Sequence, residues 1–185
     1  MPSPLLLDRS RAVLCVIDIQ ERLAAAMAER RPVIEAARRM ILSACRLNVP
    51  IVLTEQYPRG IGPTESALVE ALGDAYAPIE KLHFSCCREP VFAARLQELA
   101  RPQVVLCGME AHVCLLATSL DLLHDGYQVH VLADGMCSRD AANKELALEQ
   151  MRQAGAVVTC VEAAVYQLLG RAGTAEFKDL LPLFK

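Results

Sequence analysis

The sequence has no hydrophobic run long enough to cross a membrane. A spanning helix needs about 18 consecutive apolar residues, and every apolar stretch here is interrupted earlier. Near the start only three leucines stand together, at 5–7, which is too short for a signal-peptide core. These absences exclude a membrane-embedded protein, and we expect a cytoplasmic protein with no membrane partner.

Basic residues are neither in excess nor gathered in one place. Lysine and arginine number 19 against 22 aspartate and glutamate residues, which leaves a net charge of −3. The two small basic clusters, at 30–32 and 37–39, are typical of a solvated helix face. A nucleic-acid-binding protein needs a basic patch, so we predict no nucleic-acid partner.

Cofactor motifs are missing as well. Gly60 and Gly62 lack the third glycine of a dinucleotide-binding fingerprint and do not follow the first predicted strand. No phosphate-binding Walker loop occurs. His83, Cys86 and Cys87 stand close together, but a structural zinc site needs two pairs of ligands and no second pair is present. We therefore predict no cofactor and no metal.

The eight cysteines do not form the pattern of a disulfide framework. A chain of this length buries roughly 70% of its unfolded surface without covalent staples. Most of the cysteines lie inside apolar runs such as VLCVID, VVLCGM and VVTCVE, where reduced, buried thiols occur. We expect free thiols, as in the cytoplasm.

Short apolar runs alternate with longer amphipathic stretches along the chain. Predicted strands occupy 12–18, 50–55, 103–109, 127–134 and 156–162, and predicted helices occupy 30–48, 65–72, 90–100, 113–126 and 139–153. Uninterrupted apolar runs are typical of strands that are covered on both faces. With no linker or repeat to divide residues 1–185, the pattern predicts one α/β domain with a mostly parallel sheet.

Polar residues collect where the predicted strands end, which is where parallel sheets bind ligands. Asp18 ends the first strand, and Cys114 opens the helix after the strand at 103–109. A helix N-terminus favours a thiolate and presents N–H groups to an oxyanion, so we expect Cys114 to have the lowest pKa of the eight thiols. Taken singly, Cys114 also fits a buried core position, Asp18 a turn, and Lys81 a side chain that reaches solvent.

Three segments carry a resemblance to a known family: TEQYPRGIGPT at 54–64, EKLHFSC at 80–86 and GMEAHVCLLATSLDLL at 108–123. With Asp18, they make residues 12–167 similar to the isochorismatase-like cysteine hydrolases, and most of all to the isochorismatase domain-containing proteins. The resemblance implies a three-layer αβα, Rossmann-like fold with a six-stranded, mostly parallel sheet. It also implies a small-molecule substrate and a homo-oligomer.

The same resemblance implies a set of functional residues. Asp18, Lys81 and Cys114 match the family's catalytic triad, and the Met109–Glu110 peptide bond matches a cis bond that aims the N–H groups of Glu110 and Cys114 at an oxyanion. In the implied reaction Asp18 takes the thiol proton, Lys81 holds Asp18 ionised, and the sulfur attacks a small amide, imide or carbamoyl-type substrate. Water then resolves the thioester, without a metal.

Two departures from the family pattern bear on the substrate. Nicotinamidases of this superfamily hold a metal with an aspartate and two histidines after the second strand, whereas the segment 54–65 contains no histidine. Isochorismatase proper cleaves a vinyl ether without a cysteine, so Cys114 argues against that reaction. Four residues are candidates for substrate contacts, with a subunit interface as the alternative for the first three: Gln56, Tyr57, Arg59 and Phe84.

Two other functions stay open. Cys114 fits a redox or sensor thiol, although no C-x-x-C motif is present and Cys107 falls inside a predicted strand with its side chain pointing elsewhere. A catalytically quiet interaction protein also fits the fold.

Two further polar residues are less favoured for catalysis. His112 is a less favoured base than Asp18, and Asp134 fits a turn. The apolar segment 163–173 is a candidate for subunit contacts, and the segment 176–185 fits either a last helix or an interface arm.

Overall fold

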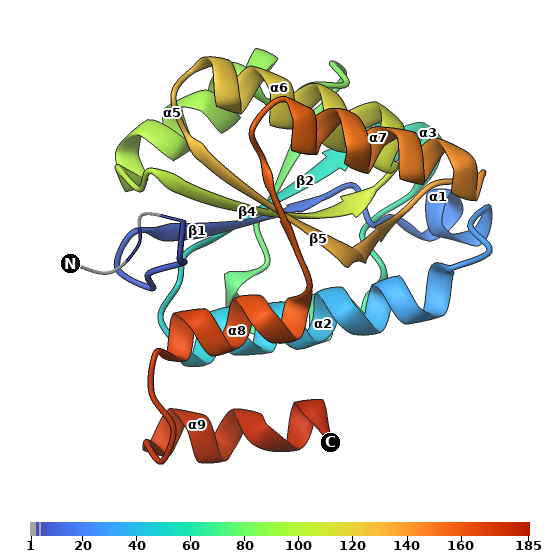
Figure 1. The fold of residues 1–185 in the computed structure, drawn as a ribbon. Helices are drawn as coiled ribbons and strands as arrows, with labels where there is room; N and C mark the ends of the chain where they lie inside the picture. Colours follow the sequence, from blue (N-terminus) through green and yellow to red (C-terminus); the bar gives the residue numbers. More distant parts are fainter. Residues whose placement is uncertain (1–2, 4) are drawn as a thin grey trace.

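Six parallel strands form one sheet at the centre of the molecule (Figure 1). The structure is a computed structural model that describes residue 3 and residues 5–185. The strands are β1 (Ala12–Ile17), β2 (Ile51–Gln56), β3 (Pro78–Lys81), β4 (Gln103–Met109), β5 (Gln128–Cys137) and β6 (Val157–Thr159). They lie in the order β3-β2-β1-β4-β5-β6, and each neighbouring pair is parallel.

Helices cover both faces of this sheet. They are α1 (Glu21–Ala25), α2 (Arg30–Arg46), α3 (Pro58–Ile61), α4 (Ser66–Leu72), α5 (Pro90–Leu99), α6 (Leu116–His124), α7 (Ala141–Gln153), α8 (Val161–Leu169) and α9 (Ala175–Leu180). In Figure 1, α5, α6 and α7 lie above the sheet, and α2 and α8 lie below it. The predicted three-layer α/β fold with a six-stranded parallel sheet is confirmed. Within the described residues, no helix has both the length and the apolar character of a membrane span.

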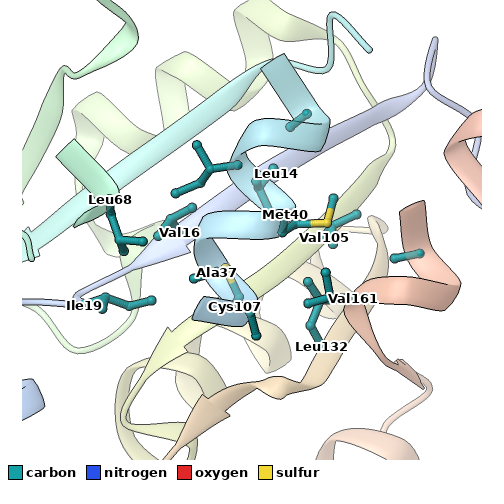
Figure 2. Close-up of a cluster of buried hydrophobic side chains, with 14 of the residues drawn as sticks. Leu14, Val16, Ile19, Ala37, Met40, Leu68, Val105, Cys107, Leu132 and Val161 are labelled. Atoms are coloured by element: carbon teal, nitrogen blue, oxygen red, sulfur yellow. The ribbon is translucent and has the colours of Figure 1, made fainter. Parts of the chain in front are cut away.

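Strand β1 is buried on both faces, which explains its uninterrupted apolar sequence. Leu14 and Val16 belong to one buried cluster with Met40 of α2 and Val161 of α8 (Figure 2). The alternate residues of β1 join a second cluster with α5, α6 and α7. Burying one large aliphatic side chain contributes about 1.5–3 kcal/mol, so the two clusters together fix β1 at the centre of the sheet.

Strand β3 is the one that the apolar pattern does not reveal. It has four residues, two of which are Glu80 and Lys81, and it lies at the edge of the sheet. An edge strand has only one neighbour and does not need the apolar run of a central strand. Only the family resemblance implied a sixth strand.

The C-terminal part differs more from the expectation. The strand predicted over 156–162 ends at Thr159. Val161 already begins α8, and its N–H donates to the carboxylate of Asp134 at 2.9 Å. Cys160, which the apolar run led us to expect inside, is therefore exposed.

The segments at 163–173 and 176–185 fold onto the chain itself. Helix α8 buries Ala164, Val165 and Leu168 in the cluster that it shares with α2. Helix α9 follows, with an aromatic contact of 6.3 Å between the ring centres of Phe177 and Tyr166. The apolar face of α8 is therefore covered within the chain, and a subunit contact of this segment stays a prediction for its exposed residues, such as Tyr166.

Candidate active site

The site lies at the carboxyl edge of the sheet, beside β1. From β1 the chain moves outward to β2 and β3 on one side and then returns to β4 on the other. The switch point between β1 and β4 is where parallel α/β sheets bind ligands. Ile17 pairs with Thr54 of β2 and with Gly108 of β4, so the residues that follow these three positions meet at this edge.

Asp18 follows β1 directly and is completely buried. Its φ of 54° is in the left-handed region, which aspartate enters more readily than most residues. The hydroxyl of Thr54 donates to its Oδ1 at 2.7 Å, and Lys81 Nζ lies 2.7 Å from its Oδ2. Each carboxylate oxygen thus has a different neighbour.

Lys81 ends β3 and turns its side chain into the protein, where none of it is exposed. The alternative in which it reaches solvent is therefore wrong. Its Nζ donates to Gln56 Oε1 at 2.6 Å and lies 3.4 Å from Cys114 Sγ. Burial opposes the charge, but the carboxylate of Asp18 and the nearby thiols outweigh that effect, and the pKa of Lys81 is raised. The group is an ammonium at neutral pH.

Cys114 lies in a π-helical turn, Ala111–Leu115, between β4 and α6, and it is buried. Burial, followed by the charge of Asp18, raises the pKa of its thiol, and Lys81 only partly offsets this. Burial likewise raises the pKa of the Cys86 thiol, to about 11. This direction is opposite to the expectation that Cys114 has the lowest pKa of the eight thiols, because desolvation and a neighbouring anion outweigh the helix terminus.

The end of β4 is shaped by Gly108. Its φ is 149°, and a Cβ at this position would lie 2.0 Å from the carbonyl oxygen of Ile17. The following Met109–Glu110 peptide bond, which the family resemblance singled out, is cis in the structure. The Glu110 carboxylate turns to Arg139, whose backbone N–H and Nε donate to it at 2.9 and 3.1 Å. The backbone of Glu110 leads directly into the turn that carries Cys114.

The four candidates for substrate contacts occupy different positions. Gln56 is buried, and both ends of its amide are used: Oε1 accepts from Lys81, and Nε2 donates to the Leu82 carbonyl at 2.9 Å. Tyr57 and Arg59 line a cavity of about 430 Å³ that also borders Lys81. Phe84 is 61% exposed and lines a neighbouring hollow of about 560 Å³.

Several other polar residues serve the fold. His112 Nδ1 lies 2.9 Å from Ser138 Oγ, and Asp134 caps α8. Cys107 packs in the cluster on the α2 side of the sheet, whereas Cys114 packs on the α5 side. Among the residues that the structure describes, no three His, Cys, Asp or Glu side chains are grouped to hold a metal.

Sequence reasoning gave no role to two buried partners of these groups, Thr54 and Gln20. Thr54 holds Asp18, and Gln20 holds the backbone of Gln56 by accepting from its N–H at 2.7 Å and donating to its carbonyl at 3.1 Å. Thr54 and Gln56 stand two positions apart in a strand and share one face. That spacing is the sequence signal that could have placed Thr54 on the same side of β2 as Gln56.

Fold and site together define a three-layer α/β protein in which a thiol, a carboxylate and an ammonium meet at the sheet switch point. Residues 12–163 match the isochorismatase domain family. The chain belongs to this family of hydrolases, which confirms the resemblance drawn from the sequence.

Relatives of the chain span nearly all of it. Human isochorismatase domain-containing protein 2 is 41% identical over 179 residues, covering 94% of this chain and 83% of that protein. The secreted isochorismatase effector Isc1 of Phytophthora sojae is 40% identical over 177 residues, covering 94% and 84%. Because one relative is secreted, a cytoplasmic location stays a prediction.

The fold is also similar to a solved structure from Caenorhabditis elegans, described as a MAR1 ribonuclease. The two superimpose with a TM-score of 0.92 at 36% identity, covering 97% of this chain and 92% of the other. The similarity thus extends over the whole sheet and both helical layers.

Proposed function

We propose that this protein is a cysteine hydrolase that cleaves a small amide, imide or carbamoyl-type substrate through a thioester. The observation that carries the proposal is the position of the buried Lys81 Nζ, 2.7 Å from Asp18 Oδ2 and 3.4 Å from Cys114 Sγ. A thiol beside a base and a cation is the arrangement that nucleophilic catalysis requires.

The first half-reaction starts from the protonated thiol. Asp18 takes the proton of Cys114 as the sulfur attacks the carbonyl carbon, and the carbonyl oxygen takes up the electron pair of its π bond. The N–H groups of Glu110 and Cys114 are the proposed donors to this oxyanion. When the carbonyl re-forms, the C–N bond breaks and Asp18 returns the proton to the leaving nitrogen. A thioester remains on Cys114.

The second half-reaction uses water. Asp18 removes a proton from the water while the water oxygen bonds to the thioester carbon. The C–S bond then breaks. The thiolate recovers a proton from Asp18, which restores the starting state. Lys81 keeps a positive charge beside Asp18 and Cys114 throughout, because its pKa is raised. Its role is to stabilise whichever of the two is an anion.

We also propose that the reaction needs no metal. The family's metal-binding nicotinamidases use histidines after the second strand, and the segment 54–65 has none. The free state of all eight cysteines fits the reducing cytoplasm as the proposed location. Exposed apolar side chains near the site support the proposed homo-oligomer: Tyr57, Leu82, Phe84 and Leu120.

The test is hydrolysis of a panel of small amides, imides and carbamates, followed by ammonia release or, for imides that open to an amide, by loss of the substrate. We expect Cys114→Ala to lower turnover by at least about 10⁴-fold, as removal of a nucleophile does. The matched control is Cys45→Ala, an exposed thiol on α2, which should keep wild-type turnover. A metal chelator in the assay should change nothing.

Three results would contradict the proposal. The first is turnover that survives in Cys114→Ala. The second is activity that the chelator abolishes. The third is a protein that is silent on the panel but cleaves isochorismate or RNA equally well with and without the Cys114 thiol, which would assign it the reactions after which its relatives are named.

A further inference from the structure

The loop that follows β3 serves the site with its backbone. Residues 82–84, here called the 82–84 loop, direct three successive carbonyls inward. Leu82 O accepts from Gln56 Nε2 at 2.9 Å, and the carbonyls of His83 and Phe84 lie 3.2 and 3.3 Å from Lys81 Nζ. The side chains of Leu82 and Phe84 point outward and are exposed. The conformation of this backbone therefore decides how the ammonium is held.

The opposite edge of the loop is held by one carboxylate, that of Glu89. Its Oε1 accepts from the backbone N–H groups of Leu82 and His83 at 2.9 and 3.0 Å, and it lies 2.8 Å from His83 Nδ1. These hydrogen bonds lower the pKa of Glu89 to about 2, so it is an anion at any working pH. Charge-assisted hydrogen bonds of this kind are about twice as strong as neutral ones.

We propose that Glu89 is a positioning residue: by holding the 82–84 loop, it keeps two carbonyls against Lys81 and so fixes the ammonium between Asp18 and Cys114. The inference rests on the proposed function of that triad. An ammonium has three protons to donate. Asp18 and Gln56 lie at 2.7 and 2.6 Å on one side, and the loop carbonyls complete the other. A loop freed from Glu89 would let Lys81 move away from the thiol.

A purely local role for Glu89 does not account for these contacts. Glu89 stands immediately before α5, but its side chain makes no capping hydrogen bond to that helix. Among the described residues, the hydrogen bonds of its carboxylate go back to Leu82 and His83, seven and six residues earlier. The carboxylate thus acts on the loop and not on the helix that it precedes.

The test follows the reactivity of Cys114 without any substrate. Alkylation by chloroacetamide is measured between about pH 7 and pH 10 by peptide mass spectrometry, with exposed Cys45 as the internal standard. The variants are Glu89→Ala, Glu89→Gln and, as reference, Lys81→Met. The matched control is Glu98→Gln on α5, which loses only an exposed ion pair to Arg95.

We expect Lys81→Met to slow Cys114 alkylation, because the cation that favours the thiolate is gone. Glu89→Ala should slow it about tenfold near pH 8, with the profile moved about one pH unit higher, since one pKa unit is a tenfold change in thiolate. Glu89→Gln, which keeps one acceptor oxygen, should fall between, and Glu98→Gln should match wild type. Unfolding would have the opposite effect on the alkylation rate, because it would expose the buried thiols of Cys114 and Cys86 and make both react faster.

Each remaining outcome overturns a defined part. If Lys81→Met slows alkylation but folded Glu89→Ala keeps the wild-type profile, the positioning role is wrong and the proposed function stands. If Glu89→Ala unfolds, a wild-type profile in Glu89→Gln overturns the role. If Lys81→Met itself has no effect on Cys114, the triad and hence the proposed function fail.

Discussion

At the scale of single residues, the surroundings of Cys114 keep its thiol protonated. Burial and the carboxylate of Asp18 both disfavour a negative charge on the sulfur. The nearby ammonium of Lys81 therefore does not by itself make the thiol give up its proton. Reactivity then depends on a substrate carbonyl to attack while Asp18 takes the proton. A resting thiol of this kind is protected from casual electrophiles, because the thiolate is the reactive form.

This protection predicts the order in which the thiols react. With iodoacetamide near neutral pH, exposed Cys45 and Cys160 should be alkylated first, and Cys114 should follow more slowly. Time-resolved peptide mass spectrometry gives the order, and protein unfolded in urea, where all eight should react alike, is the control. Fastest labelling of Cys114 in the native protein would contradict the raised pKa.

Sequence reasoning named Asp18, Lys81 and Cys114, and the structure brings their side chains together. It offered Gln56 as a substrate contact, although its amide is used on Lys81 and Leu82. The direction of a side chain at a strand end depends on neighbours that are distant in sequence. Residue type and spacing could not supply that direction.

At the scale of elements, the approach of β4 to β1 brings the two halves of the site together. Gly108 lies opposite Ile17 in the register, and the absence of a Cβ lets the strands meet there. Asp18 comes directly after Ile17, and the turn that carries Cys114 begins a few residues after Gly108. The spacing of the two strands thus sets the spacing of base and thiol.

We therefore predict that Gly108→Ala both destabilises the fold and abolishes turnover. Its Cβ would lie 2.0 Å from the Ile17 carbonyl oxygen, and overpacking of this kind costs about 1–3 kcal/mol. The matched control is Gly126→Ala, which also has positive φ, at 87°, but meets nothing within 4 Å. Urea denaturation gives the free energies of unfolding. Equal losses in the two variants would show that the backbone angle, and not the contact, is what matters.

Which elements the sequence revealed follows from burial. β1, β2, β4 and β5 are covered on both faces or nearly so, and buried parallel strands leave uninterrupted apolar runs. The edge strand β3 has four residues and little of that signal, whereas the apolar run around β6 revealed this strand but placed its end three residues too late. Lys81, at the end of β3, was consequently placed by resemblance and not by pattern.

At the scale of the whole molecule, one buried histidine couples stability to pH. His130 lies in β5 with 1% of its surface exposed, and its Nδ1 has no hydrogen-bond partner among the described residues. Burial lowers its pKa below the ordinary value. The unfolded chain therefore binds a proton at His130 more readily than the folded one. The contribution of His130 to the free energy of unfolding is retained above about pH 6.5 and is lost as the pH falls from there through the lowered pKa of the folded state.

We predict that His130→Leu flattens this part of the stability curve. Wild type should lose free energy of unfolding between about pH 7.5 and pH 5.5, and the variant should lose less, because no imidazole remains to be protonated on unfolding. The control is His124→Leu, an exposed histidine at the end of α6, which should follow wild type. Chemical denaturation at each pH measures the difference. Parallel curves for wild type and His130→Leu would refute the assignment.

The sequence by itself determined the α/β class, the order of the main elements and the placing of Asp18 and Cys114 at strand ends, because buried parallel strands and their termini are written in local apolar pattern. The tertiary structure alone decided the edge strand β3, the end of β6 at Thr159, the inward turn of Lys81, the protonation of the Cys114 thiol and the contacts of Glu89 with the 82–84 loop. The position of Lys81 and the protonation of Cys114 depend on contacts between groups far apart in the chain and on their burial, whereas the contacts of Glu89 depend on the path of the loop between β3 and α5.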